Sequence, residues 1–183
     1  SAPTAGVVAA LRQTPGDIAL LGAGGKMGPS LARMARRAAD IADAGNTPRR
    51  IIAVSRFSEP GLGESLRALG IEAIAADLLD EASLNRLPDA PNVVFMTGMK
   101  FGASGNAAHT WAMNAWLPGL ICARYRGSRV AAFSTGNVYG LRPVAGGASV
   151  ESDALQPQGE YAMSCLGRER IFEYFSRERG MPL

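Results

Sequence analysis

Glycines recur three residues apart in the segment Gly22-Ala23-Gly24-Gly25-Lys26-Met27-Gly28. The segment follows a short apolar run and precedes a stretch rich in alanine and arginine, which is the order of a strand, a turn and a helix. In such a turn Gly22 permits the tight bend, Gly25 lets the backbone approach a pyrophosphate, and Gly28 lets helix and strand pack closely. The amides at the start of the helix then face the phosphates. The spacing therefore predicts a loop that holds the pyrophosphate of a dinucleotide.

Charged side chains in and after this loop indicate which dinucleotide fits. We expect Gly24 and Met27 to contact the cofactor with the rest of the loop, and Lys26 to place a positive charge near the phosphates or to be a solvated side chain. The next apolar run ends at Ser55-Arg56, where an acidic residue would bind the ribose 2′-hydroxyl of NAD. The planar guanidinium of Arg56 suits a 2′-phosphate instead, so the sequence favours NADP, with NAD as the alternative.

Two later segments of the chain contain serine, threonine and tyrosine side chains that could take part in proton transfer. The segment Ser134-Thr135-Gly136-Asn137-Val138-Tyr139-Gly140 follows an apolar run, and Tyr161-Ala162-Met163-Ser164-Cys165 opens a helical stretch. Together with the glycine loop, these segments resemble the extended short-chain dehydrogenase/reductase family, which contains NAD(P)-dependent epimerases and dehydratases of sugar nucleotides. The resemblance covers nearly the whole chain and keeps the order of the family's motifs.

The resemblance implies roles for several residues. Thr135 matches the residue that hydrogen-bonds the substrate oxygen, and Tyr161 matches the catalytic tyrosine that exchanges a proton with that oxygen while hydride moves to or from the nicotinamide. The resemblance also implies that Asp77 and Leu78 contact the adenine of the cofactor. The segment 96–99, which includes Thr97 and Gly98, would flank its ribose. Asn114 matches a helical asparagine that supports the active site.

The tyrosine motif departs from the family at one position. The family has a lysine four residues after the tyrosine, where this chain has Cys165. Four residues on a helix place both side chains on one face, and a lysine there lowers the pKa of the tyrosine and holds the nicotinamide ribose. A thiol does neither, so Cys165 would line the cofactor without supplying charge, and acid/base catalysis by Tyr161 needs another cation. Lys100, after the fourth apolar run, is the candidate.

The elements that must position these residues alternate along the chain. Short apolar runs predict strands at 17–21, 51–54, 72–76, 93–96 and 130–133. Helical patterns lie at 4–13, 29–44, 65–69, 83–87, 107–125, with Pro118 as a kink or a boundary, and 159–179. We expect Leu31, Met34 and Ile41 on the apolar face of the second helix. The alternation predicts an α/β fold of Rossmann type: a doubly wound parallel sheet with helices on both faces.

Composition excludes several other classes of protein. The 183 residues are 47% hydrophobic and 19% charged, which is ordinary for a globular domain. The net charge of +3 comes without a dense basic stripe, which argues against nucleic-acid binding. One histidine, His109, cannot form a metal site without partners, and the two tryptophans are expected in the core. Two cysteines and the absence of a signal sequence or an 18-residue apolar run favour a cytoplasmic protein away from membranes.

Two functions remain open. The first is an NAD(P)-dependent oxidoreductase or epimerase/dehydratase-like enzyme that acts on a carbonyl or hydroxyl substrate, such as a nucleotide sugar. The second is a non-catalytic NAD(P)-binding sensor or regulator, because Cys165 replaces the lysine. We expect residues 1–183 to form one NAD(P)-binding domain that lacks the family's C-terminal substrate-binding part. The resemblance implies a homodimer through the last helix and the helix before the fifth strand, although some apolar residues of the last helix must pack on the sheet instead.

Overall fold

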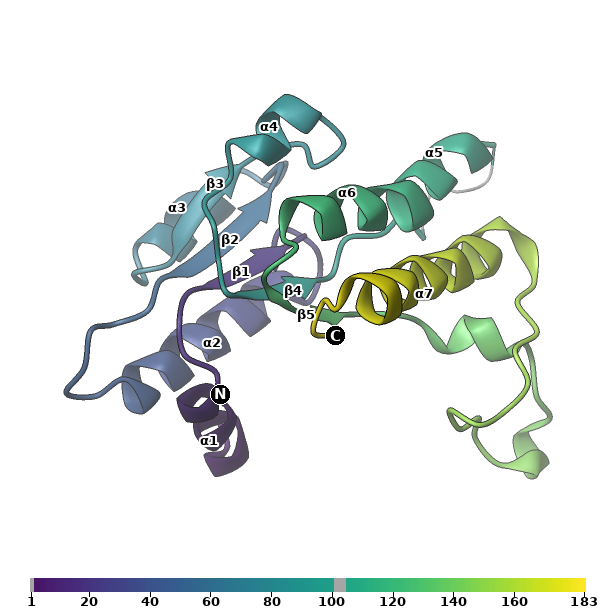
Figure 1. The fold of residues 1–183 in the computed structure, drawn as a ribbon, viewed down its shortest axis with the longest axis horizontal. Coiled ribbons are helices and arrows are strands. Elements are labelled where there is room, and N and C mark those ends of the chain that lie inside the picture. Colours follow the sequence, from purple (N-terminus) through teal and green to yellow (C-terminus); the bar gives the residue numbers. More distant parts are fainter. Residues whose placement is uncertain (1, 101–104) are drawn as a thin grey trace.

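The computed structural model describes residues 2–100 and 105–183 and contains one parallel sheet in the order β3-β2-β1-β4-β5 (Figure 1). The chain adds β2 and β3 on one side of β1, then crosses over to add β4 and β5 on the other side. The carboxyl ends of β1 and β4 therefore border the crevice where such sheets bind ligands. The strands are β1 (Ile18–Leu21), β2 (Ile51–Ser55), β3 (Glu72–Ala75), β4 (Asn92–Phe95) and β5 (Arg129–Ala132).

Helices lie on both faces of the sheet, as the sequence predicts (Figure 1). Thr4 caps the first of them through a hydrogen bond from the Val7 amide to its Oγ1, at 3.3 Å. No helix in the described part of the chain combines the length and the apolarity needed to span a bilayer. The helices are α1 (Ala5–Gln13), α2 (Gly28–Ala42), α3 (Leu62–Arg67), α4 (Glu81–Asn85), α5 (Ala107–Trp111), the π-helix η1 (Ala112–Trp116), α6 (Leu117–Arg124), the 3-10 helices η2 (Gly136–Tyr139) and η3 (Val144–Gly146), and α7 (Gly159–Arg179).

Alternate residues of the strands supply two hydrophobic cores, because successive side chains point to opposite faces. Ile18 and Leu20 face α2 and α3, while Ala19 and Leu21 face α4, α6 and α7. In the second core the rings of Phe95 and Phe172 meet edge to face, with centroids 5.3 Å apart. This contact ties α7, which carries the predicted tyrosine, directly to β4.

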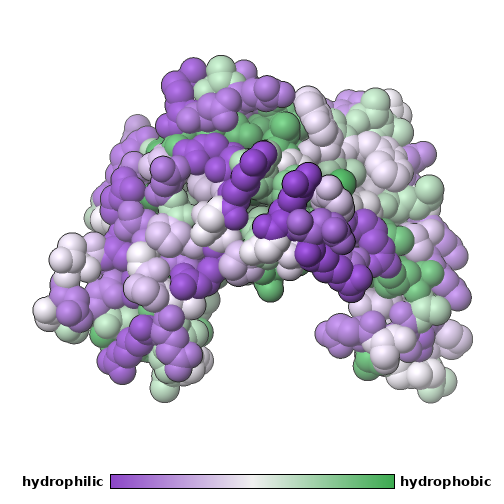
Figure 2. All heavy atoms as spheres, in the orientation of Figure 1, coloured by the Kyte–Doolittle hydropathy of each residue, from purple (hydrophilic) through white to green (hydrophobic). Residues whose placement is uncertain are grey.

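One of the two edge strands, β5, is covered on one face only. Val130 is buried, whereas Arg129 and Ala131 on the other face are exposed. The Val130 amide donates to the carbonyl of Pro182 at 2.8 Å, so the last residues described begin to pair with this strand. Figure 2 shows a hollow on the lower side of the molecule, between α1 and α2 and the segment 140–158.

Two predicted helices differ from the structure. The single helix expected at 107–125 is divided into α5, η1 and α6, and Pro118 lies in the first turn of α6, where its missing amide is tolerated. In α2 the small residues Ala32, Ala38 and Ala39 face the sheet, so the helix packs closely, and Ile41, predicted on the apolar face, is 48% exposed. The prediction that both tryptophans lie in the core is also wrong, since Trp111 and Trp116 are both exposed, Trp116 by 55%.

Candidate functional site

A cavity of about 410 Å³ lies at the carboxyl edge of the sheet. It is bounded by the loop from β1 to α2, by the residues that follow β2, β3 and β4, and by α5 and η1. The sequence-predicted residues that line it are Gly22, Gly24, Gly25, Ser55, Arg56, Asp77, Leu78, Thr97 and Gly98. The structure therefore brings together four separate segments of the predicted cofactor site.

The glycine loop leaves no room for side chains where it meets the neighbouring strands. Gly22 has φ of +95°, and a Cβ there would lie 2.9 Å from the Thr97 nitrogen. A Cβ on Gly24 would lie 2.3 Å from the Ser55 hydroxyl oxygen. The amide of Gly22 donates to the Val54 carbonyl at 2.9 Å, which fixes the loop against β2. Bare backbone thus faces the cavity.

Four predicted cofactor contacts lie outside the residues that line this cavity. Lys26 and Met27 are exposed at the start of α2, and Gly28 packs against Ala23. Cys165 is fully buried on α7. Contact between these residues and a cofactor stays a prediction, and for Gly28 the structure indicates a packing role between loop and helix.

Thr97 provides a test of whether a dinucleotide suits the cavity. Its Oγ1 is buried without a hydrogen-bond partner in the described part of the chain. A buried hydroxyl without a partner is costly, so it marks a place where a bound polar group would be stabilising. The oxygen lies beside Gly22 in the cavity wall. An unpaired hydroxyl next to bare loop backbone fits the sugar and phosphate oxygens of a dinucleotide.

The cavity also contains residues that the sequence did not single out as a site. His109 of α5 and Met113 of η1 line it, together with Ser58 and Glu59 after β2. The sequence offered no signal for them, because their approach depends on how α5 and η1 pack over the sheet. His109 lines the wall of the cavity, and no group of three or more His, Cys, Asp or Glu side chains that could hold a metal ion occurs among the described residues.

The two predicted catalytic residues come from different elements and meet beyond this cavity. Thr135 follows β5, and its Oγ1 accepts from the Asn137 amide at 3.3 Å, which caps η2. Tyr161 lies in the first turn of α7 and is half-buried. Burial raises the pKa of Tyr161, a hydrogen bond with Thr135 lowers it, and the neighbouring Cys165 raises it. The net shift is upward, so Tyr161 is a neutral phenol at neutral pH.

Two features of the tyrosine's surroundings bear on the missing lysine. Burial also raises the pKa of Cys165, so this residue is a neutral thiol. Lys100 lies over the Tyr161 ring, with its Nζ 5.6 Å from the centroid, and its charge lowers the pKa of Cys165. The candidate cation of the sequence analysis is therefore within cation–π range of the tyrosine.

Asn114 holds the segment that leads to Lys100. Its Oδ1 accepts from the Met99 amide at 2.8 Å, and its Nδ2 donates to the Met99 carbonyl at 3.1 Å and to Ser164 Oγ at 3.0 Å. The residue lies in the π-helix η1, a distortion often found at functional sites. Asn114 thus links the segment after β4 to α7, and its support of an active site stays a prediction.

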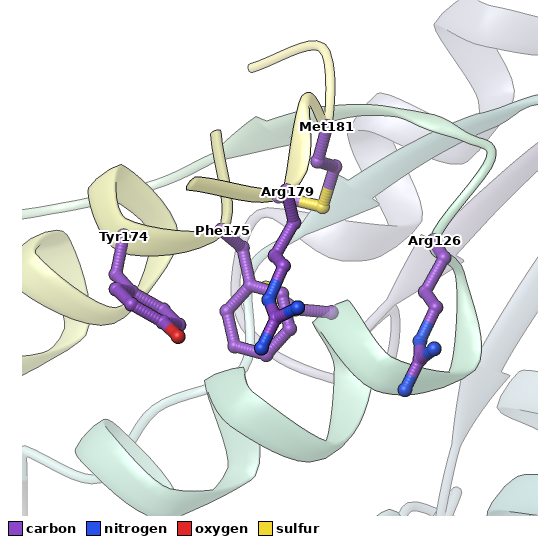
Figure 3. Close-up of a pocket in the computed structure, with 6 residues that line it drawn as sticks. Arg126, Tyr174, Phe175, Arg179 and Met181 are labelled. Carbon is purple, nitrogen blue, oxygen red and sulfur yellow. The ribbon is translucent and has the colours of Figure 1, made fainter. Parts of the chain in front are cut away.

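A second pocket, of about 290 Å³, lies at the other end of α7. Figure 3 shows Tyr174, Phe175 and Arg179 on α7, with Arg126 opposite them and Met181 beside them. Burial raises the pKa of Cys122, which also lines this pocket, to about 12. Since none of the predicted site residues borders it, the dinucleotide cavity remains the candidate site.

The fold and the cavity together define a Rossmann-type domain with the glycine loop at its ligand-binding edge. The sequence model of the NAD dependent epimerase/dehydratase family matches residues 18–183. The chain belongs to this family, which confirms the resemblance drawn from its motifs. A comparison with curated protein sequences finds no significant match.

Solved structures of similar fold include nucleotide-sugar enzymes. A dTDP-glucose 4,6-dehydratase from Streptomyces venezuelae with NAD bound is 19% identical, with 90% of this chain and 53% of that chain covered and a TM-score of 0.75. A UDP-Glc/GlcNAc 4-epimerase from Campylobacter jejuni is 18% identical, with 91% and 50% of the two chains covered and a TM-score of 0.74. A UDP-glucuronic acid 4-epimerase from Bacillus cereus in complex with NAD is 19% identical, with 91% and 54% covered and a TM-score of 0.68. The chain spans about half the length of these proteins.

Proposed function

We propose that this chain binds a nicotinamide dinucleotide in the 410 Å³ cavity and supports hydride transfer to or from a carbon that carries a hydroxyl or carbonyl group. The observation that carries the proposal is the convergence of the glycine loop, Thr97 and the strand ends on one cavity, with Thr135 and Tyr161 beyond it. The enzymes of similar fold act on nucleotide sugars, and we propose the same class of substrate here.

Direct titration tests the core of this proposal. Intrinsic fluorescence or calorimetry would be followed while NADP or NAD is added to the purified chain. Saturable binding is expected, because bare loop backbone and the unpaired Thr97 hydroxyl face the cavity. Absence of binding at millimolar concentrations of both dinucleotides would refute it.

Arg56 makes NADP our proposed cofactor, with NAD as the alternative. The side chain is exposed at the cavity, after β2, and no hydrogen bond or ion pair within residues 2–100 and 105–183 occupies it. A guanidinium in this position suits a 2′-phosphate. The solved NAD complexes concern other chains, so the preference is tested on this one.

An Arg56→Ala variant should bind NADP about tenfold more weakly and NAD with unchanged affinity, because a charge-assisted contact to the 2′-phosphate contributes about 1.4 kcal/mol or more. Calorimetric dissociation constants for both dinucleotides measure this. Arg33→Ala is the matched control, since Arg33 is an exposed arginine on α2 that lines another pocket. Equal weakening toward NAD and NADP would contradict the assignment.

The nicotinamide supplies the hydride acceptor or donor when the cofactor is bound. Thr135 would hold the substrate oxygen, and Tyr161 would exchange a proton with it through the phenol group. Since burial keeps Tyr161 protonated, the residue is ready to donate a proton to a carbonyl oxygen. Removing a proton from a hydroxyl requires the phenolate, which a nearby cation stabilises.

Lys100 is our proposed partner for that step. A Lys100→Met variant should lower turnover about tenfold, because the cation over the Tyr161 ring is lost while the side chain keeps its length. Lys100→Arg, which keeps the charge, is the conservative control and should retain most of the activity. The measurement is steady-state turnover with saturating cofactor, and unchanged turnover in the Lys100→Met variant would exclude the role.

Cys165 favours a second candidate function, a cofactor-binding sensor or regulator without catalysis. The fully buried thiol cannot supply the charge of the family's lysine. This alternative predicts tight cofactor binding, no hydride transfer in the native chain, and hydride transfer in a Cys165→Lys variant. Reduction of a carbonyl panel by the native chain would exclude it.

Three finer features of the protein stay predictions. They are the cytoplasmic location, the homodimer, and the organisation of residues 1–183 as one NAD(P)-binding domain. Phe172 of α7 is buried in the core, so it is unavailable for a dimer contact. Size-exclusion chromatography with light scattering would measure the oligomeric state.

A further inference from the structure

Three polar residues of α7 follow one another on the face that packs against the sheet. Tyr161, Cys165 and Arg168 are spaced by four and three residues, so they share one side of the helix. Cys165 is fully buried and Arg168 is only 6% exposed. The cationic side chain of Arg168 therefore enters the core one turn beyond the position where the family's lysine would be.

The guanidinium of Arg168 is held entirely by neutral oxygen acceptors. Its Nη1 donates to the Phe133 carbonyl at 2.9 Å, and its Nη2 and Nε donate to Asn114 Oδ1 at 2.9 Å and to the Asn114 carbonyl at 3.4 Å. It also lies over the Phe95 ring, 5.6 Å from the centroid. No carboxylate of the described residues hydrogen-bonds the guanidinium, and the charge of Glu169 acts on it only through space.

Gly98 shows how close this charge comes to the cofactor cavity. A Cβ on Gly98 would lie 2.5 Å from Arg168 Nη2 and 3.1 Å from Asn114 Oδ1. Gly98 lines the cavity, so the guanidinium lies directly behind the cavity wall. Burying a cation costs free energy of desolvation, so a buried arginine beside the cavity and the predicted catalytic tyrosine suggests a functional role.

The other charged groups near Tyr161 are Lys100, Glu160 and Glu169. Lys100 lies over the ring. Glu160 accepts a hydrogen bond from Trp111 Nε1, and Glu169 accepts one from Ser134 Oγ. Burial raises the pKa of Tyr161 and of Cys165. At Cys165 the charge of Arg168 is the largest cause that lowers the pKa, while at Tyr161 the hydrogen bond with Thr135 lowers the pKa more than the charge of Arg168 does. The positive charge of Arg168 therefore acts on both Tyr161 and Cys165, which lie on the same face of α7.

We propose that Arg168 is a positioning residue that carries, one turn further along α7, the positive charge that the tyrosine motif lacks at position 165. It acts on Tyr161 through its field along this face of α7, while its hydrogen bonds to Asn114 and Phe133 hold it there. The inference rests on the proposed role of Tyr161 as the proton-exchanging residue.

The test is a titration of Tyr161 in the chain without cofactor or substrate. Tyrosinate absorbance is followed with rising pH, and the signal of a Tyr161→Phe variant is subtracted to remove the other tyrosines. In Arg168→Gln, which keeps a hydrogen-bond donor but loses the charge, the ratio of tyrosinate to tyrosine at a given pH should fall about tenfold. Arg168→Lys, which keeps the charge, should stay within about threefold of the unmodified chain.

Arg170→Gln is the matched control, since Arg170 is an exposed arginine on the same helix and pairs with Glu173. A purely structural role would lower the melting temperature of Arg168→Gln and leave the Tyr161 titration unchanged, which would overturn the proposal. So would equal shifts in the Gln and Lys variants.

If Arg168→Gln does not fold, the double variant Cys165→Lys/Arg168→Gln returns the cation to the motif position and should titrate like the unmodified chain; a tenfold deficit there also overturns the proposal. The titration of Tyr161 is carried out without a dinucleotide. A failure of the chain to bind NADP or NAD would therefore refute the proposed function without affecting the outcome of this titration.

Discussion

A Tyr161→Phe variant is expected to lose turnover by a factor of about 10²–10⁴, the usual contribution of a positioned acid/base group. Phenylalanine removes the hydroxyl that contacts Thr135 and Cys165 but keeps the ring beneath Lys100. The dissociation constant for the dinucleotide should change little, because Tyr161 lies outside the residues that line the cofactor cavity. Turnover and cofactor affinity, measured on the same preparation, separate the two effects.

Tyr174→Phe is the matched control, since this exposed tyrosine lies near the other end of α7. The pH profile adds a second check. Burial raises the pKa of Tyr161 above its ordinary value near 10, so the proton-donating direction should hold its rate through neutral pH and lose it only above that raised pKa. The proton-removing direction should gain rate over the same high-pH range. A Tyr161→Phe variant with native turnover would exclude the residue from the chemistry.

A Gly28→Ala variant should be destabilised by about 1–3 kcal/mol or more and should bind the dinucleotide poorly. The added Cβ would lie 2.2 Å from the Ala23 carbonyl oxygen and 2.4 Å from its carbon, and backbone atoms cannot rotate aside. Either α2 moves away from the loop or the loop distorts, and overpacking of this kind usually costs that amount. Urea unfolding measures the first effect and calorimetric titration the second.

Gly127→Ala serves as the control for the same substitution. A Cβ on Gly127 would meet no atom within 4 Å, and its φ is not in the left-handed region. The free energy of unfolding should therefore change by only a few tenths of a kcal/mol. Equal stability of the two variants would mean that the contact between Gly28 and Ala23 is easily relieved, and the packing role assigned to Gly28 would be wrong.

The sheet and its glycine loop could be predicted from the sequence because both depend on local patterns. Runs such as 51–54 are apolar because parallel strands are buried on both faces, and β2 is found there with one further residue. The cavity residues at Ser55, Asp77 and Thr97 follow from the same logic, since carboxyl ends of parallel strands meet at one edge.

Other parts of the site depend on packing between distant segments and left no local signal. A π-helix at Ala112–Trp116 cannot be read from helical periodicity, yet it sets the position of Asn114. His109 reaches the cavity only through the placement of α5. Arg168 reads in the sequence as one of many helix-surface arginines, and only its three neutral acceptors identify it as a core residue.

The close approach of Gly98 and Arg168 ties together two positions that are far apart in the sequence. A side chain at position 98 would displace the guanidinium of Arg168. A shorter residue at position 168 would leave room for a Cβ at position 98 on the side that faces α7. The two positions should therefore change together in evolution. Among related chains, those with a larger residue at the position of Gly98 are expected to lack an arginine at that of Arg168, and to keep the lysine where this chain has Cys165.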